Sequence, residues 1–206
     1  MINNYRLSFT GASFFLYESI ELAKLYIVLG SWDEAVKAVI DSNVNKRSKS
    51  TIKRESSEIV IRLKTLSEEL LEKFVSSDPD DAKIILLYAI FKSYPIIKLF
   101  CIDVLYDKTL MLDHDIQEYE INMFFRQQEE LHEVYEKKSD MTKKKLKQVM
   151  FKILADANLI KSTLSKVIIK PYIDTAISKM IVDDSDESYL RALLMSESEI
   201  AMLGVN

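Results

Sequence analysis

Two short segments concentrate the positive charge of this 206-residue chain. Residues 46–64 contain seven lysines and arginines but only two carboxylates, Glu55 and Glu58. Residues 137–152 contain seven more basic side chains and a single carboxylate, Asp140. The whole chain nevertheless has a formal charge of −4, so its remainder is strongly acidic. Because a polyanion responds to the local field rather than to net charge, this segregation indicates two surfaces that bind the phosphates of a nucleic acid.

The first basic segment follows the order of a helix-turn-helix. A predicted helix from about Trp32 to Ser42 is followed by a turn and a second helix over residues 50–64, although the loop of roughly six residues is longer than the usual turn. Hydroxyl and basic side chains gather at the start of the second helix, where backbone N–H groups also attract phosphate. The alternative is a solvated basic face that pairs with acidic parts of the protein. The predicted DNA contacts are Lys46, Arg47, Lys49, Lys53 and Arg54.

The second basic segment begins another predicted helix, residues 141–157. Its apolar residues form one stripe from Leu146 to Ala157, and we expect Lys143 and Lys147, four residues apart, to face solvent together. Two strand candidates follow, so residues 159–170 are a candidate wing, and the helix with this ribbon outlines a winged helix. Lysine runs on exposed helices are common, so this segment is less specific than the first. The predicted contacts are Lys143, Lys144, Lys145 and Lys147.

Both segments suit the holding of a phosphate backbone better than the reading of bases. Lysine binds phosphate as a point charge, whereas specific base contacts favour Arg or Asn. No catalytic or metal-binding set stands out among His114, His132 and the single cysteine, Cys101, which lies in an apolar helix. The acidic residues 183–187 lack the pattern of a calcium loop and are predicted to be a linker. We therefore predict no enzyme activity, no metal site, no cofactor and no small-molecule substrate.

The pattern along the chain predicts an all-α, multi-helix protein with at most one short β-ribbon. Apolar residues recur at helical spacing almost throughout, and the chain has only three glycines and three prolines. The uniformly apolar run 84–91 predicts a central core helix. A long charged helix is expected over about 115–137, beyond a domain boundary that divides residues 1–111 from 112–206. The lone cysteine and the absence of a long apolar run predict a cytoplasmic protein that does not enter a membrane.

An ordered set of short motifs resembles the BrxA family of bacterial BREX (bacteriophage exclusion) defence systems. The set begins with residues 7–11, Leu-Ser-Phe-Thr-Gly, and continues with Glu18-Ser19 and Trp32. It includes residues 53–54, 61–63 and 66–70, then residues 142–146 and 154–160, with Pro171 after the ribbon. Ala12 stands where a second glycine is common in the family. The resemblance covers most of the chain, to about residue 180.

The resemblance implies a non-enzymatic, all-helical subunit of a phage-defence system, with an N-terminal part similar to the NusB fold and a family association with DNA. Combined with the charge pattern, it predicts a subunit that grips double-stranded DNA with little sequence preference and contacts other BREX proteins. Two alternatives remain open. One is an RNA-binding module in the manner of NusB, and the other is a scaffold whose basic segments meet acidic partner proteins.

Overall fold

Helices form almost all of the structure, a computed structural model that describes residues 5–11, 13–43 and 48–204. Its all-helical, multi-helix architecture confirms the predicted fold class. The first half contains η1 (Ser8–Gly11), α1 (Leu16–Leu29), α2 (Trp32–Asn43), α3 (Lys49–Leu63), α4 (Glu68–Ser76), α5 (Pro79–Ser93) and α6 (Pro95–Phe100). The second half contains the π-helix η2 (Cys101–Tyr106), α7 (Asp107–Leu110), α8 (Glu118–Leu131), α9 (Glu133–Glu136), α10 (Asp140–Asp156), α11 (Thr175–Asp184), α12 (Ser188–Ala192) and α13 (Glu197–Ala201).

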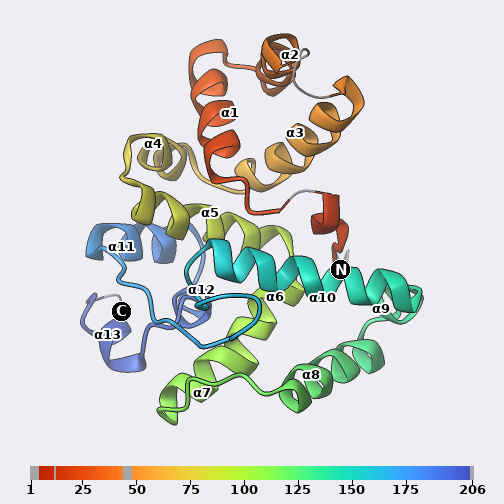
Figure 1. The fold of residues 1–206 in the computed structure, drawn as a ribbon. Coiled ribbons are helices and arrows are strands. Elements are labelled where there is room, and N and C mark those ends of the chain that lie inside the picture. Colours follow the sequence, from red (N-terminus) through yellow and green to blue (C-terminus); the bar gives the residue numbers. More distant parts are fainter. Residues whose placement is uncertain (1–4, 12, 44–47, 205–206) are drawn as a thin grey trace.

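Helix α5 lies at the centre of the molecule (Figure 1). Asp78 caps its first turn and Pro79 occupies the first helical position, where a missing N–H is tolerated. All residues from 84 to 91 are buried, which confirms the predicted core helix. Pro95 stops α5 and restarts the chain as α6, because proline lacks the N–H that a continuing helix needs. The break bends the chain by 113° and turns it toward the opposite end of the molecule.

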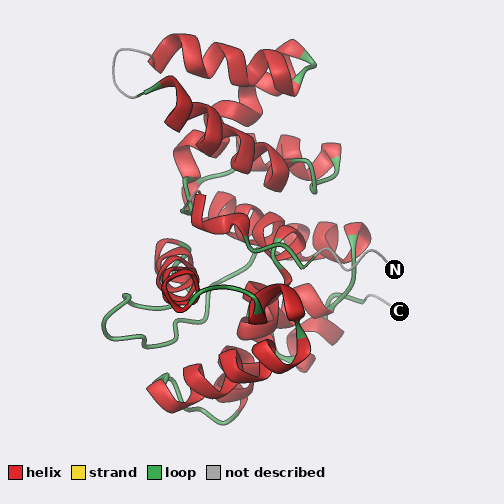
Figure 2. Ribbon diagram, turned by 90° about the vertical axis from the view of Figure 1, so that its right-hand side faces the viewer, coloured by secondary structure: helices red, strands yellow, loops and turns green. Residues whose placement is uncertain are grey.

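Helices α1, α2 and α3 stack at one end of the molecule, and α7 and α8 lie at the other (Figures 1 and 2). Helix α10 lies across the middle of the molecule, between these two ends (Figure 1), and its Phe151 packs against Phe100 of α6. One continuous cluster of buried side chains extends from Tyr5 to Leu203 and includes residues of both ends. The division of the chain at residues 111 and 112 stays a prediction, as does the similarity of the N-terminal part to NusB.

A buried arginine, Arg62 of α3, connects this helix to the segment that precedes α1. Arg62 has no exposed surface, and its Nη1 donates a hydrogen bond of 2.6 Å to the carbonyl oxygen of Ser13. Its Nε donates to the hydroxyl of Tyr94 at 3.2 Å, and that hydroxyl donates to the buried carboxylate of Glu58. Ser8 donates to the same carboxylate oxygen at 2.7 Å. The buried charges are therefore hydrogen-bonded, as groups removed from water must be.

The same N-terminal stretch also contacts the second half of the chain. The Tyr5 hydroxyl donates to the side-chain oxygen of Gln128 on α8 at 2.7 Å. The Tyr5 ring stacks on His132, with 3.7 Å between ring centroids. Contacts of η1 with both α3 and α10 place it between the two basic helices. The described residues between Tyr5 and Phe15 therefore join parts of the molecule that are distant in sequence.

The structure corrects two expected elements. The helix expected over residues 115–137 is interrupted at His132, whose backbone is extended, so α8 and α9 are separate helices. The expected ribbon is shorter than a pair of strands. Among the described residues, β-pairing consists of two isolated antiparallel bridges, Ile160 with Ile168 and Asp115 with Val167. The second bridge pairs Val167 with Asp115, which lies before α8. The alternation of residues within 159–170 cannot predict this pairing, because the partner lies far away in sequence.

None of the described helices is by itself long and apolar enough to span a lipid bilayer. Helix α5 and the stretch Pro95–Leu110 pass that test only when taken together, across the 113° bend.

Replacing Tyr94 with phenylalanine should weaken the fold. Loss of the hydroxyl removes the acceptor of Arg62 Nε and a donor to Glu58, both buried, so the free energy of unfolding should fall by about 1–3 kcal/mol. Urea unfolding followed by circular dichroism measures the change. Tyr17→Phe is the matched control, since Tyr17 is 74% exposed and its change should stay within about 0.5 kcal/mol. Equal stability of the Tyr94→Phe protein and the wild type would contradict a stabilising role for this network.

Candidate nucleic-acid interface

The start of α3 presents three basic side chains to solvent. Ser48 caps the helix by accepting a hydrogen bond from the N–H of Thr51, which leaves the remaining first-turn N–H groups directed outward. The apolar side of the helix is buried at Ile52. Lys49, Lys53 and Arg54 are exposed, and none of the three has an ion-pair partner among the described residues. Lys46 and Arg47 were also predicted as contacts and lie outside the described residues.

The last turn of the same helix has the opposite environment. Arg62, which contributes to the positive charge of segment 46–64, is fully buried in the network with Tyr94 and cannot reach a nucleic acid. Glu58 is buried there too. Within the described part of segment 46–64, the first turns of α3 carry exposed charge, whereas Glu58 and Arg62 belong to the core.

The start of α10 resembles the start of α3. Ser139 caps the helix by accepting from the N–H of Thr142, and the two side-chain hydroxyls lie 3.0 Å apart. The equivalent hydroxyls of Ser48 and Thr51 lie 2.8 Å apart. Lys144 and Lys145 are exposed, and within the described part of the chain neither forms an ion pair. Lys138, just before the helix, is exposed as well, although it was not among the predicted contacts.

Lys143 and Lys147 pack against α8, which corrects the expectation that both face solvent. The Lys143 ammonium lies 2.6 Å from Glu129, and its side chain is only 15% exposed. Lys147 donates to the side-chain oxygen of Asn122 at 3.2 Å and lies 4.9 Å from the centre of the Phe125 ring. Spacing along α10 shows that the two lysines share a face, but the neighbouring helix decides what that face contacts. Lys143 is therefore held on α8, whereas Lys147 contacts α8 and stays partly exposed.

Both capped helix starts lie toward the right-hand side of Figure 1, where η1 separates them. Figure 2 looks onto that side, with α10 seen end-on and the start of α3 near the top. Helix N-termini carry a partial positive charge, so an anion approaching this side meets two helix dipoles in addition to the lysines. The arrangement supplies two positively charged positions on one side of an otherwise acidic protein.

The hairpin after α10 lies close to this helix and carries further lysines. Ile169 N–H donates to the carbonyl of Leu159 at 2.8 Å, and Lys161 N–H donates to Val167 at 2.8 Å. Lys161 is exposed, whereas Lys166 lies 3.2 Å from Glu118 and 5.5 Å from the centre of the Phe151 ring. The predicted wing at residues 159–170 is therefore a short hairpin held against α8 and α10, and its role in binding stays a prediction.

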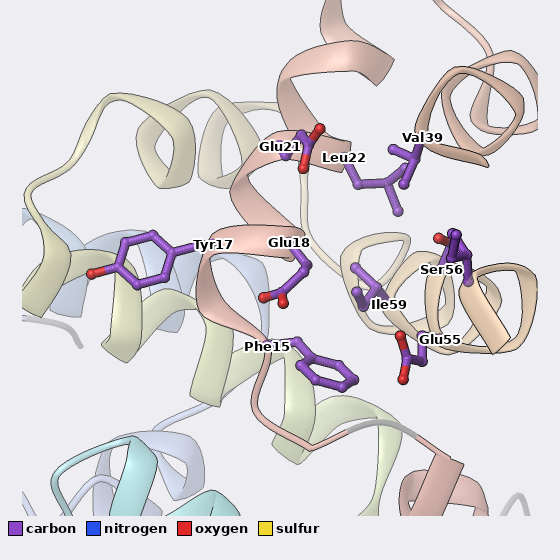
Figure 3. A pocket seen from close by; sticks show the side chains of 10 residues that line it. Phe15, Tyr17, Glu18, Glu21, Leu22, Val39, Glu55, Ser56 and Ile59 are labelled. Carbon is purple, nitrogen blue, oxygen red and sulfur yellow. The ribbon is translucent and has the colours of Figure 1, made fainter. Parts of the chain in front are cut away.

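A hollow of about 350 Å³ between α1, α2 and α3 has an acidic rim (Figure 3). Its apolar walls include Phe15, Leu22 and Ile59. Glu18 of α1 and Glu55 of α3 lie on opposite sides of it, with Glu21 nearby. Carboxylates repel phosphate, so this side of α3 is unsuited to a nucleic acid and restricts binding to the outer side of the helix.

The described residues contain no group of three or more His, Cys, Asp or Glu side chains that could hold a metal ion. Cys101 is completely buried, and burial raises the pKa of its thiol well above the ordinary value, which disfavours the reactive thiolate. The His132 ring stacks on the Tyr5 ring. Partial burial lowers the pKa of His132.

The different environments of Lys143 and Lys144 predict different effects on stability. Lys143→Ala removes the contact with Glu129 and the packing beside Tyr135, so the free energy of unfolding should fall by about 1 kcal/mol. Lys144→Ala should change it by less than about 0.5 kcal/mol. Denaturant unfolding of the two alanine variants compares them directly, and equal effects would show that Lys143 does not hold α10 on α8.

Comparison with known proteins identifies the family. The family model of BrxA matches residues 3–185. The BREX protein BrxA of Bacillus cereus (strain H3081.97) is 26% identical over 147 residues, which cover 69% of this chain and 74% of that protein. A crystal structure of an uncharacterized protein from Magnetospirillum magneticum superposes with a TM-score of 0.77 at 21% identity, over 94% of this chain and 100% of that one, and shows a common fold. Because the family model spans most of its length, this chain belongs to the BrxA family.

Proposed function

We propose that this chain holds double-stranded DNA through phosphate contacts, without catalysing a reaction on it, as part of a BREX defence system. Membership of the BrxA family makes it a BREX component. The DNA-binding role rests on the charge and geometry of the two capped helix starts. Other proteins of the same system are its expected partners.

The observation that carries the proposal is the exposed cationic start of α3. Lys49, Lys53 and Arg54 are exposed in the first two turns of α3, near the N–H groups of its N-terminal end. Each contributes a side chain that has no internal anion to neutralise it among the described residues. Surface lysines and arginines at a helix N-terminus bind phosphate by charge and by hydrogen bonds together. This combination favours DNA over an acidic protein surface, which offers no regular row of anions.

The start of α10 supplies a second, smaller contact. Lys144 and Lys145 are available there, while Lys143 and Lys147 are engaged with α8. A duplex that spans both helix starts would touch the protein at two places on the same side, with η1 between them. Two separated contacts to phosphates would fix the direction of the duplex. They would read little of its sequence, because Arg54 is the one described candidate whose guanidinium can form two hydrogen bonds to a guanine.

A binding role without catalysis agrees with the chemistry of the described side chains. Acid–base or nucleophilic catalysis needs a titratable group within hydrogen-bond reach of a nucleophile in an accessible cleft. In the hollow between α1, α2 and α3, the only hydroxyl side chains of the lining are the exposed Tyr17 and the buried Ser56, and no histidine or lysine lies beside its carboxylates. The buried polar network of Arg62, Tyr94 and Glu58 is hydrogen-bonded internally and stabilises the fold.

Charge reversal at α3 should weaken DNA binding. Lys53→Glu with Arg54→Glu replaces two phosphate contacts with repulsion, so affinity for a duplex of random sequence should fall at least about tenfold at moderate salt. Mobility-shift titration measures the affinity, and circular dichroism should show unchanged helical content.

Lys24→Glu with Lys179→Glu is the matched control, because both lysines are exposed and lie outside the two helix starts. This double variant has the same net charge as the α3 double variant and should lose much less affinity. An equal loss in both would mean that overall charge, and not the α3 site, drives binding. The corresponding test of α10 is Lys144→Glu with Lys145→Glu.

The salt dependence should report how many phosphates are contacted. Five exposed lysines and arginines at the two helix starts (Lys49, Lys53, Arg54, Lys144 and Lys145) predict a slope of log affinity against log salt of about −4.5 for duplex DNA. Fluorescence anisotropy across a salt series measures this slope. Competition by structured RNA at fixed salt separates the RNA-binding alternative, and absence of binding to either nucleic acid at low salt would favour the scaffold alternative.

A further inference from the structure

Helix α8 and the turn after α7 present a group of exposed apolar side chains. Met111 is 78% exposed and Leu112 is 83% exposed, both in the turn after α7. Met123 is 66% exposed on the next helix, with Tyr119 one turn before it on the same face. Met111 and Met123 line one groove of about 200 Å³, so the turn and α8 form a single surface. We call these four residues the α7–α8 surface.

The groove of the α7–α8 surface is rimmed by carboxylates. Asp103 and Asp107 lie one turn apart and line it together with Glu120. Of these, Glu120 is paired with Lys108, whereas neither aspartate has an ion-pair partner within the described ranges. Partial burial, followed by the negative charge of Asp107, raises the pKa of Asp103. A cation placed near the two aspartates would favour their charged forms and oppose both effects.

The turn that carries these apolar residues is held firmly in place. Lys108 is buried, and its ammonium lies 2.5 Å from Asp113 and 2.8 Å from Glu120, which ties the turn to α8. Leu112 adopts a left-handed backbone conformation with φ of 57°, which is strained for a branched side chain. The π-helix η2 directly precedes α7, and π-helical turns are frequent at functional sites. Met111 and Leu112 are therefore exposed in a turn whose conformation is fixed by the ion pairs of Lys108.

The surface lies at the opposite end of the molecule from α2 and α3 (Figures 1 and 2). Its carboxylates repel DNA, so it is not an extension of the cationic helix starts. Flexible methionine side chains on an exposed apolar patch are typical of protein-binding surfaces, because they adapt to a partner.

We propose that the α7–α8 surface docks a segment of another protein that presents a lysine or arginine next to an apolar side chain. The apolar side chain enters the groove between Met111 and Met123, and the cation meets Asp103 and Asp107. Binding there leaves the starts of α3 and α10 accessible, so the protein can hold DNA and a protein partner at once.

Site-specific photocrosslinking tests this docking surface. The full-length tagged chain, with p-benzoylphenylalanine in place of Tyr119 or Leu112, is co-produced with the other proteins of its BREX system and irradiated in cells. Mass spectrometry then identifies the crosslinked peptides. Placing the photocrosslinker at Val28 is the control, because Val28 is 81% exposed but lies on α1 at the other end of the molecule.

We expect crosslinks at positions 119 and 112 to a segment with a basic residue beside an apolar one, and no such crosslink at position 28. Adding Asp103→Asn with Asp107→Asn should lower the crosslink yield at least about fivefold, while DNA affinity stays at or above the wild-type value. Crosslinks mainly to a second copy of this chain, to an acidic segment or to nothing at all would overturn the proposal. A yield that is unchanged by the asparagine substitutions would overturn it as well.

Discussion

The hydrogen bonds of Arg62 hold together parts of the chain on which the rest of the structure depends. A guanidinium without solvent contact needs hydrogen-bond partners, and Arg62 finds them in the hydroxyl of Tyr94 and in the carbonyls of Ser13 and Phe14. Tyr94 directs its own proton to Glu58, which also accepts from Ser8. The N-terminal stretch is thereby fastened to α3, and the start of α6 is fastened to both.

This network has a consequence for the cationic surface. Helix α3 is anchored at its C-terminal end by Arg62 and Glu58, so its N-terminal end points outward with Lys49, Lys53 and Arg54 in solvent. Through η1, the same N-terminal stretch contacts α10, whose start carries Lys144 and Lys145. The relative placement of the two cationic helix starts is therefore set by interior hydrogen bonds and packing, and not by the lysines themselves.

In the described part of the chain, the unpaired basic side chains at the two helix starts and the unpaired aspartates of η2 and α7 lie on different surfaces of the molecule. Among the described residues, the exposed basic side chains at the starts of α3 and α10 have no ion-pair partner, whereas Lys108 pairs with Asp113 and Glu120 and Lys143 pairs with Glu129. Asp103 and Asp107, which form no ion pair within the described ranges, lie elsewhere, beside the exposed Met111 and Met123. A protein arranged in this way meets polyanions and cationic protein segments on different surfaces, which allows two kinds of partner to bind without competing.

Sequence alone determined the helical class, the core helix over residues 84–91, the break at Pro95 and the motifs that the BrxA family shares. These features depend on local periodicity, on the missing N–H of proline and on the order of short motifs along the chain. Tertiary structure decided which cations remain available: Arg62 is buried, Lys143 is paired with Glu129, and Lys144 stays in solvent. It also interrupted α8 at His132 and brought Met111 beside Met123. The physical reason is that burial and pairing depend on residues far away in sequence, which helical spacing cannot locate.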